Sequence, residues 1–254
     1  MKSYLLLLAI SFSMVASAKK QVCLYTNEDK EICYEAEKID SIYFFEDTPN
    51  LLNLHEYVDL DLPSGTKWAT TNIGAKTPEE FGDFFFWGGT KGQKVFSKST
   101  TLTYNLELEE MIEKGYCDKD GILTKEYDAA NCNWGDGWRM PTIEECEELI
   151  QNTTRKQTEI NGIVGIMYTS KNNGNSIFFP SAGYYITDIL AQDGIIGEYW
   201  SSSYAKTSVE NTFYEYKGKL LYSSNGFVSN DYRNIGLPIR PVTTFEYNTK
   251  DKGF

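Results

Sequence analysis

From about residue 55 onward the chain consists of short aromatic runs separated by Gly, Asn, Ser and Pro turns, with few long helical patterns. Runs of this kind are typical of short strands. In the last third, residues 212–216 and 220–222 flank Lys217-Gly218-Lys219, which predicts a hairpin, and Asn225-Gly226 predicts a second tight turn. Residues 237–242 read as a closing strand whose prolines restrict it to an edge or to bulged positions. We therefore predict an α+β fold with many short strands.

One helix is well specified. Thr142 can cap it, and Glu145 completes a T-x-x-E capping box. Ile143, Cys146 and Leu149 then follow at helical spacing as one apolar stripe. Residues 108–112 indicate a second, shorter helix. The predicted fold thus has one or two helices.

The N-terminus predicts export. Lys2 precedes an apolar run from Leu5 to Val15, and Ala16-Ser17-Ala18 supplies a small-residue cleavage site. The alternative is a membrane anchor, but the run is shorter than the roughly 20 apolar residues that a spanning helix needs. No later segment is long and apolar enough to span a bilayer. We predict a signal peptide at 1–18 and a periplasmic, cell-surface or secreted protein.

Charge and histidine content exclude several function classes. The chain of 254 residues has 36 Asp and Glu against 24 Lys and Arg, a net charge of −12, which disfavours nucleic acid as a partner. His55 is the one histidine, so multi-His metal sites are excluded. The carboxylates give no sign of a converging catalytic pair. We expect no enzyme activity, no cofactor and no metal.

Five cysteines allow disulfides in an exported chain. Cys23 and Cys33 bracket a polar turn and could form a bridge, as could Cys117 and Cys132. The odd count leaves at least one thiol unpaired within the chain. Cys146 is the expected free thiol, because it falls on the apolar helix stripe.

Tryptophans and arginines in apolar surroundings are candidates for the core. We expect Trp68, Trp87, Trp138 and Trp200 to be buried with their indole N–H groups bonded to backbone, and Trp134, in a turn-rich loop, to be more exposed. Two arginines, Arg139 and Arg240, are candidates for buried structural cations, and Asp128 could accept hydrogen bonds from backbone N–H groups or from these arginines.

Ordered blocks along the chain resemble a known family. The blocks are 56–60 (EYVDL), 62–70 (LPSGTKWAT), 72–75 (NIGA), 79–88 (EEFGDFFFWG), 127–130 (YDAA), 138–142 (WRMPT), 178–184 (FFPSAGY), 199–203 (YWSSS) and 239–242 (IRPV). Together they resemble the Fibrobacter succinogenes major paralogous domain, which is abundant in gut Bacteroidota. The resemblance covers roughly residues 55–243.

The resemblance implies a C-type-lectin-like fold, as in sulfatase-modifying factors and the variable proteins of diversity-generating retroelements. It implies a binding surface on the C-terminal strands and loops, and no reaction. Formylglycine-generating enzymes use a late cysteine pair, and no cysteine follows Cys146 here. The expected organisation is a signal peptide at 1–18, a small N-terminal β unit with linker at 19–50, the C-type-lectin-like domain at 51–243 and a tail at 244–254.

Residues 199–236 are the expected binding segment. Tyr, Ser, Asn and Gly account for 20 of these 38 residues. Tyrosine offers a large amphipathic contact area, and the small polar residues offer adaptable contacts. The alternative is that strands and turns of an exported β-rich domain use these residues in any case. The candidate ligand contacts are Tyr204, Tyr214, Tyr216, Tyr222, Asn225, Phe227, Asn230, Tyr232 and Arg233.

The resulting hypothesis is an exported, non-enzymatic recognition module that binds a glycan or a protein through this surface. A structural or adhesin component of a cell-surface assembly is the first alternative. A glycan hydrolase that relies on carboxylates is the second.

Overall fold

The computed structural model describes residues 21–25, 31–35, 55–206, 208–210 and 213–244. The chain divides into two compact units, residues 1–51 and 52–254. In the first, β1 (Gln21–Tyr25) pairs antiparallel with β2 (Glu31–Glu35), and Cys23 lies opposite Cys33 in the ladder. A disulfide between them stays a prediction. The predicted signal peptide, the strand-like run 39–45, the linker 48–50 and residues 245–254 lie outside the described residues.

The second unit is a mixed α+β domain, as predicted, and all strand ladders among its described residues are antiparallel. Its sheets have the strand orders β15-β4-β3, β5-β6-β7, β8-β9, β10-β13-β14 and β11-β12. The strands are β3 (Tyr57–Val58), β4 (Lys67–Ala69), β5 (Thr153–Ile160), β6 (Ile163–Ser170), β7 (Ser176–Pro180), β8 (Tyr184–Ile186), β9 (Ile189–Ala191), β10 (Glu198–Tyr204), β11 (Ser208–Glu210), β12 (Phe213–Glu215), β13 (Lys217–Tyr222), β14 (Phe227–Tyr232) and β15 (Val242–Thr243).

The helices are short. They are α1 (Leu108–Glu113), the 3-10 helix η2 (Lys125–Tyr127), α2 (Ala129–Trp134) and α3 (Ile143–Asn152). The capping box of α3 is confirmed, because the Thr142 side chain accepts from the N–H of Glu145 and the Glu145 carboxylate accepts from the N–H of Thr142. The shorter helix expected at 108–112 is α1. Among the described residues, none of the helices has the length and apolar content needed to cross a bilayer.

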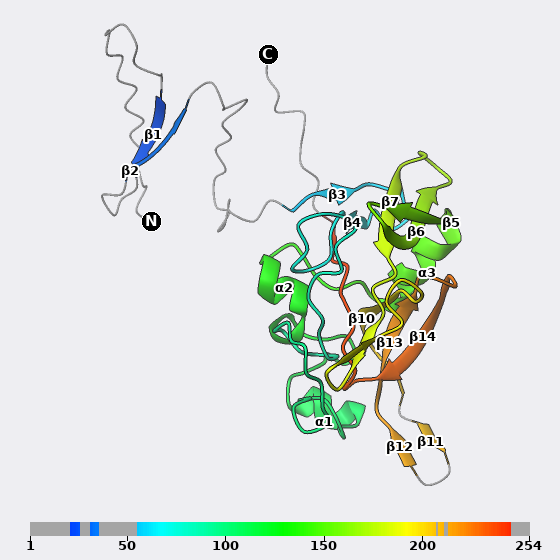
Figure 1. Cartoon of the computed structure of the whole chain (residues 1–254). Helices are drawn as coiled ribbons and strands as arrows, with labels where there is room; N and C mark the ends of the chain where they lie inside the picture. The colour runs from blue at the N-terminus through cyan, green and yellow to red at the C-terminus, as the bar shows by residue number, and fades with distance from the viewer. Residues whose placement is uncertain (1–20, 26–30, 36–54, 207, 211–212, 245–254) are drawn as a thin grey trace, which may run out of the picture. The chain divides into compact units, whose positions relative to one another are not determined.

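The β10–β13–β14 sheet separates two hydrophobic cores. Trp200 and Leu220 on one face join the first core, which includes residues of α1 and α2. Tyr199 and Leu221 on the other face join the second core, which includes residues of α3, β6 and β7. Figure 1 shows α1 and α2 on one side of this sheet and α3 on the other. Side chains of a strand alternate between the two faces of its sheet. Because both faces are covered here, consecutive residues 198–203 of β10 are all buried.

The hairpin predicted around Lys217-Gly218-Lys219 is wrong. These residues begin β13, which pairs with β10 and β14, whereas β12 pairs with β11. Gly218 is needed for a close approach and not for a turn: a Cβ there would lie 2.5 Å from Cδ1 of the Trp87 ring. The turn predicted at Asn225-Gly226 is confirmed, because it joins β13 to β14 and Gly226 has a φ of 67°.

The predicted closing strand is mostly an irregular segment. Only Val242–Thr243 are strand, paired with β4. Pro238 and Pro241 lie outside the ladder, as expected of proline, and their carbonyls accept from the N–H groups of Trp200 and Ala69. The segment thereby connects two sheets through backbone bonds.

Four of the five tryptophans are buried as predicted. Trp87 donates from its indole N–H to the carbonyl of Ser201, and Trp200 donates to that of Phe85, both at 2.9 Å. The indole N–H of Trp68 has no partner among the described residues. The greater exposure expected for Trp134 is wrong. It is 7% exposed, because His55 stacks on its ring at a centroid distance of 3.5 Å.

The bridge suggested between Cys117 and Cys132 is absent. Both thiols are free, Cys117 buried and Cys132 exposed. Cys146 is free and fully buried, as predicted from the helix stripe. Arg240 is buried and donates to the carbonyls of Ala69 and Thr70, as expected of a structural cation. The second expected structural cation, Arg139, is only partly buried.

Candidate binding site

Four side chains from four strands lie side by side across the domain. Glu198 of β10 is the register partner of Tyr222 in β13, and Tyr222 is the partner of Phe227 in β14. Directly opposed residues project from the same face of a sheet. A parallel bridge between Gly183 and Gly197 brings the next residue of β8, Tyr184, alongside Glu198. We call Tyr184, Glu198, Tyr222 and Phe227 the aromatic row.

Two rings of the aromatic row form a stacked pair at the surface. The centroids of Tyr222 and Phe227 are 5.0 Å apart with an interplanar angle of 17°. Phe227 is 46% exposed, while Tyr184 and Tyr222 are half-buried against the first core. Half-burial restricts the Tyr222 ring, and Phe227 stacks on that ring while leaving contact area to solvent. The pair can therefore serve as a preformed stacking surface.

Glu198 is the polar member of the aromatic row. Its side chain is 7% exposed, and its Oε2 is buried without a hydrogen-bond partner. Burial, with a smaller contribution from the charge of Asp231, raises the pKa of Glu198 to about 7. Burial also raises the pKa of Tyr222, to which the charge of Glu198 and then Tyr184 add.

The β13–β14 turn closes one end of the aromatic row. Gly197 donates its N–H to Oγ of Ser224 at 2.7 Å, and the Ser223 hydroxyl donates to the carbonyl of Gly197 at 2.9 Å. The segment that precedes β10 is thus tied to the turn, with Ile195 68% exposed beside it. Asn225 at the turn is exposed, so its amide is available to a ligand at the edge of the rings.

The nine predicted contact residues do not form one surface. Phe227 and Tyr222 belong to the aromatic row, with Asn225 at its end. Asn230 and Tyr232 are exposed but alternate onto the other face of β14, with Val228, which packs on the second core. The Lys217 Nζ lies 5.3 Å from the centroid of the Tyr232 ring.

The remaining predicted contacts fall elsewhere. Tyr216 is half-buried, with its ring centroid 5.5 Å from that of Tyr104. Tyr204 is half-buried against the first core. The backbone of Tyr214 belongs to β12, but its side chain is outside the described part of the structure, so the expected pairing of the Tyr214 and Tyr216 rings stays a prediction.

Arg233 was expected at the surface and is fully buried, so that prediction is wrong. Its Nη1 donates to the carbonyls of Thr103 and Leu106, at 2.8 and 2.9 Å, and its Nε donates to that of Lys217 at 2.9 Å. Its guanidinium also lies over the Trp87 ring, 5.2 Å from the centroid. Carbonyls and π faces thus solvate the cation internally, and it joins three segments of the fold.

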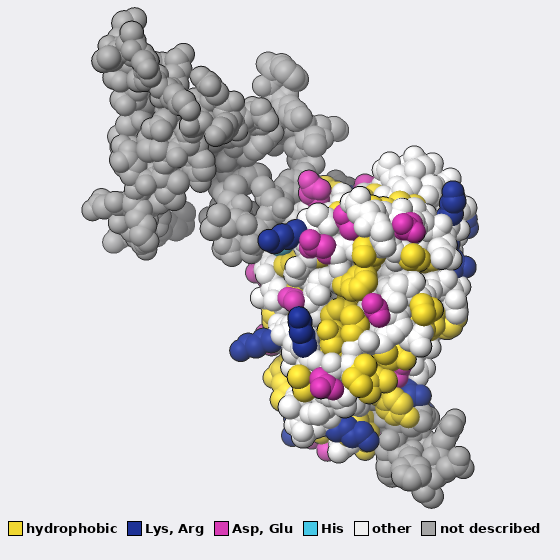
Figure 2. Space-filling view, viewed as in Figure 1, with side chains coloured by type: hydrophobic (Ala, Val, Ile, Leu, Met, Phe, Trp, Pro, Cys, Tyr) yellow, Lys and Arg dark blue, Asp and Glu magenta, His cyan; other side chains and the backbone are white. Residues whose placement is uncertain are grey.

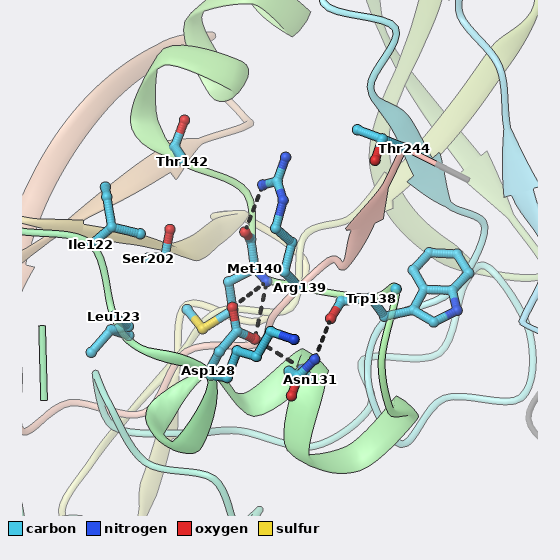
Figure 3. Close-up of a pocket in the computed structure, with 12 residues that line it drawn as sticks. Ile122, Leu123, Asp128, Asn131, Trp138, Arg139, Met140, Thr142, Ser202 and Thr244 are labelled. Carbon is cyan, nitrogen blue, oxygen red and sulfur yellow. Dashed lines mark hydrogen bonds between the residues drawn. The ribbon is translucent and has the colours of Figure 1, made fainter. Parts of the chain in front are cut away.

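A concavity lies where α2 meets the start of α3, and none of the aromatic-row residues line it. It is a cleft of about 360 Å³, shown in Figure 3, lined by parts of residues 122–142 together with Ser202 and Thr244. The Asp128 carboxylate accepts from the N–H groups of Ala130, Asn131 and Met140, so its predicted bonds to backbone are confirmed. Arg139 pairs with Glu145, with an Nη1 to Oε2 distance of 2.6 Å.

The charged groups of this cleft, Asp128 and Arg139, already have partners within the protein. Burial raises the pKa of Asp128, and its backbone hydrogen bonds oppose that shift. The carboxylate caps α2 and fixes the chain entering α3, which is a structural task. We therefore locate the candidate binding site at the aromatic row, where a polar group lacks a partner.

Sequence reasoning missed two members of the row, Tyr184 and Glu198. Glu198 directly precedes the segment that was singled out, and a charged residue opening the buried run Tyr199-Trp200 was the available signal. Within the described residues, no group of three or more His, Cys, Asp or Glu side chains is arranged to hold a metal. No protein-family model, curated protein or solved structure matches the chain.

Proposed function

We propose that this chain is an exported recognition module of C-type-lectin-like fold that binds a glycan at the aromatic row. Support for the fold comes from the α+β architecture and from the ordered sequence blocks that resemble the Fibrobacter succinogenes major paralogous domain. Support for export comes from residues 1–18.

The observation that carries the binding proposal is the stacked, partly exposed pair Tyr222–Phe227 beside Asn225 and Glu198. The C–H face of a sugar ring is apolar and packs on an aromatic face, while its hydroxyls need hydrogen-bond partners. The row supplies both kinds of contact. Sites that bind small ligands combine apolar walls with a few placed polar groups in the same way.

A second candidate, a subunit of a surface assembly or adhesin, is favoured by a different observation. Ile186, Ile189 and Ile195 are 50, 64 and 68% exposed. On the face shown in Figure 2, hydrophobic side chains gather down the middle of the domain, with acidic side chains between them. Apolar patches of this kind are typical of surfaces that contact protein partners.

A glycan array with the purified protein and its Phe227→Ala variant tests the proposal. Leu102→Ala is the matched control, because Leu102 is 56% exposed and lies outside the aromatic row. We expect Phe227→Ala to weaken glycan binding about ten-fold, or about 1.4 kcal/mol, and the control to bind as wild type. Unchanged binding by Phe227→Ala would refute the site. Capture of one stable protein partner, lost in Ile189→Asp, would support the second candidate instead.

A further inference from the structure

The Glu198 carboxyl group has no hydrogen-bond or ion-pair partner among the described residues. Neither carboxyl oxygen accepts a hydrogen bond from a described side chain or backbone group, and no described Lys or Arg forms an ion pair with it. Its side chain is nevertheless 7% exposed. Burying an ionised carboxylate without a partner costs several kcal/mol. Such a group is therefore either protonated or paired with a cation supplied by a ligand.

The surroundings of Glu198 are suited to a positive partner. Three aromatic rings, of Tyr184, Tyr222 and Phe227, lie in the same row, and an aromatic face attracts a cation through its quadrupole. The negative charge of Asp231 raises the pKa of Glu198, as burial also does. A cation near Glu198 is therefore attracted by both carboxylates. The net charge of −12 adds a long-range attraction for cations and repels anions.

We propose that the aromatic row binds a ligand that carries an ammonium group, with Glu198 as the counter-ion and the rings of Tyr184, Tyr222 and Phe227 as its walls. The inference rests on the proposed function, because it specifies the chemistry of the ligand at the same site. An amino sugar or a lysine side chain on a polymer has this chemistry. A cationic group supplies the charge partner that the fold lacks, and its apolar carbons pack on the rings.

The proposal has a proton linkage with a defined sign. Without ligand, burial raises the pKa of Glu198 to about 7, so the carboxyl is mostly protonated at pH 6 and mostly ionised at pH 8. The titratable groups that face it are Tyr222 from β13, Tyr184 from β8 and Asp231 from β14. A cation binds the ionised form, so affinity rises with pH, and binding at low pH releases a proton.

Choline and its neutral isostere 3,3-dimethyl-1-butanol are the probes, measured by calorimetry against the full chain. Choline carries a permanent charge, so any pH dependence comes from the protein. The ionised fraction of a group with a pKa of about 7 rises about ten-fold between pH 6 and pH 8, and we expect the affinity for choline to rise by the same factor. The neutral isostere should bind more weakly than choline at pH 8 and without this dependence.

Glu198→Gln keeps the shape of the side chain and removes its charge. We expect it to abolish both the pH dependence and the preference for choline. Equal affinity for the two probes in wild type, or a pH dependence that persists in Glu198→Gln, would overturn the inference. If this variant does not fold, proton release by wild type at pH 6, measured in two buffers of different ionisation enthalpy, decides the question: release supports the inference and none refutes it.

The two proposals fail separately. The recognition function stands and the ammonium inference is wrong if neutral glycans bind, Phe227→Ala weakens that binding, and choline is not preferred over its neutral isostere. If choline binds as expected while no glycan on the array does, the inference stands and the glycan proposal is wrong.

Discussion

Gly218→Ala tests the placement of β13 against Trp87. A Cβ at this position would lie 2.5 Å from Cδ1 of the Trp87 ring, 2.6 Å from Cγ and 2.9 Å from Nε1. The ring cannot move aside easily, because Trp87 is fully buried and its indole N–H is bonded to the Ser201 carbonyl at 2.9 Å. The guanidinium of Arg233 also packs over the ring.

The expected loss of stability combines two opposing effects. Overpacking by one methyl group in a filled core costs about 1–3 kcal/mol. Replacing glycine by alanine restricts the unfolded chain, which returns about 0.4–1 kcal/mol. We expect a net loss of about 1.3 kcal/mol, which for a domain of this size lowers Tm by about 3–5 °C.

Urea unfolding followed by circular dichroism measures the change, with a thermal scan in parallel. Lys219→Ala is the matched control, because Lys219 is the next residue of β13 and is only half-buried. We expect this control to lie within about 0.5 kcal/mol of wild type. If Gly218→Ala were as stable as the control, the glycine would not be held against Trp87, and the position of β13 would be wrong.

Three further outcomes follow from the described contacts. Asp128→Ala should lower the free energy of unfolding by about 2–4 kcal/mol in urea, because it removes the cap of α2 and leaves the buried N–H of Met140 without its acceptor. Burial lowers the pKa of His55. The stabilisation from the neutral, buried imidazole is therefore complete above the unfolded-state pKa of about 6.5 and is lost as the pH falls. His55→Phe should flatten the dependence of Tm on pH between 7 and 5. With a thiol reagent at pH 8, Cys132 should react in the native protein, whereas Cys117, whose pKa burial raises to about 12, should react only after unfolding; fast native reaction of Cys117 would contradict its burial.

Features that depend on neighbours in sequence were predictable. The capping box of α3 involves Thr142 and Glu145, three residues apart, and the β13–β14 turn depends on Asn225-Gly226. In both cases the required groups lie within one turn of chain, so their geometry is set before any packing. The burial of four of the five tryptophans was also predictable, because burying a large apolar ring is favourable, whereas the burial of Trp134 depends on the His55 ring that stacks on it.

The roles of Gly218, Arg233 and Glu198 were decided by tertiary structure alone. In the sequence, Lys217-Gly218-Lys219 looks like a turn between two strands. Only the close packing of the Trp87 ring on Gly218 explains why a glycine is needed inside a strand. Arg233 reads as a surface cation until Thr103 and Leu106, from a distant segment, supply its acceptors. Glu198 becomes a candidate ligand contact only when three other strands, β8, β13 and β14, place aromatic rings beside it. The sequence determined the local turns, caps and apolar content, because those interactions span a few residues. The tertiary structure decided which partner each buried polar group has, because that partner comes from a segment distant in sequence and depends on which strands become neighbours.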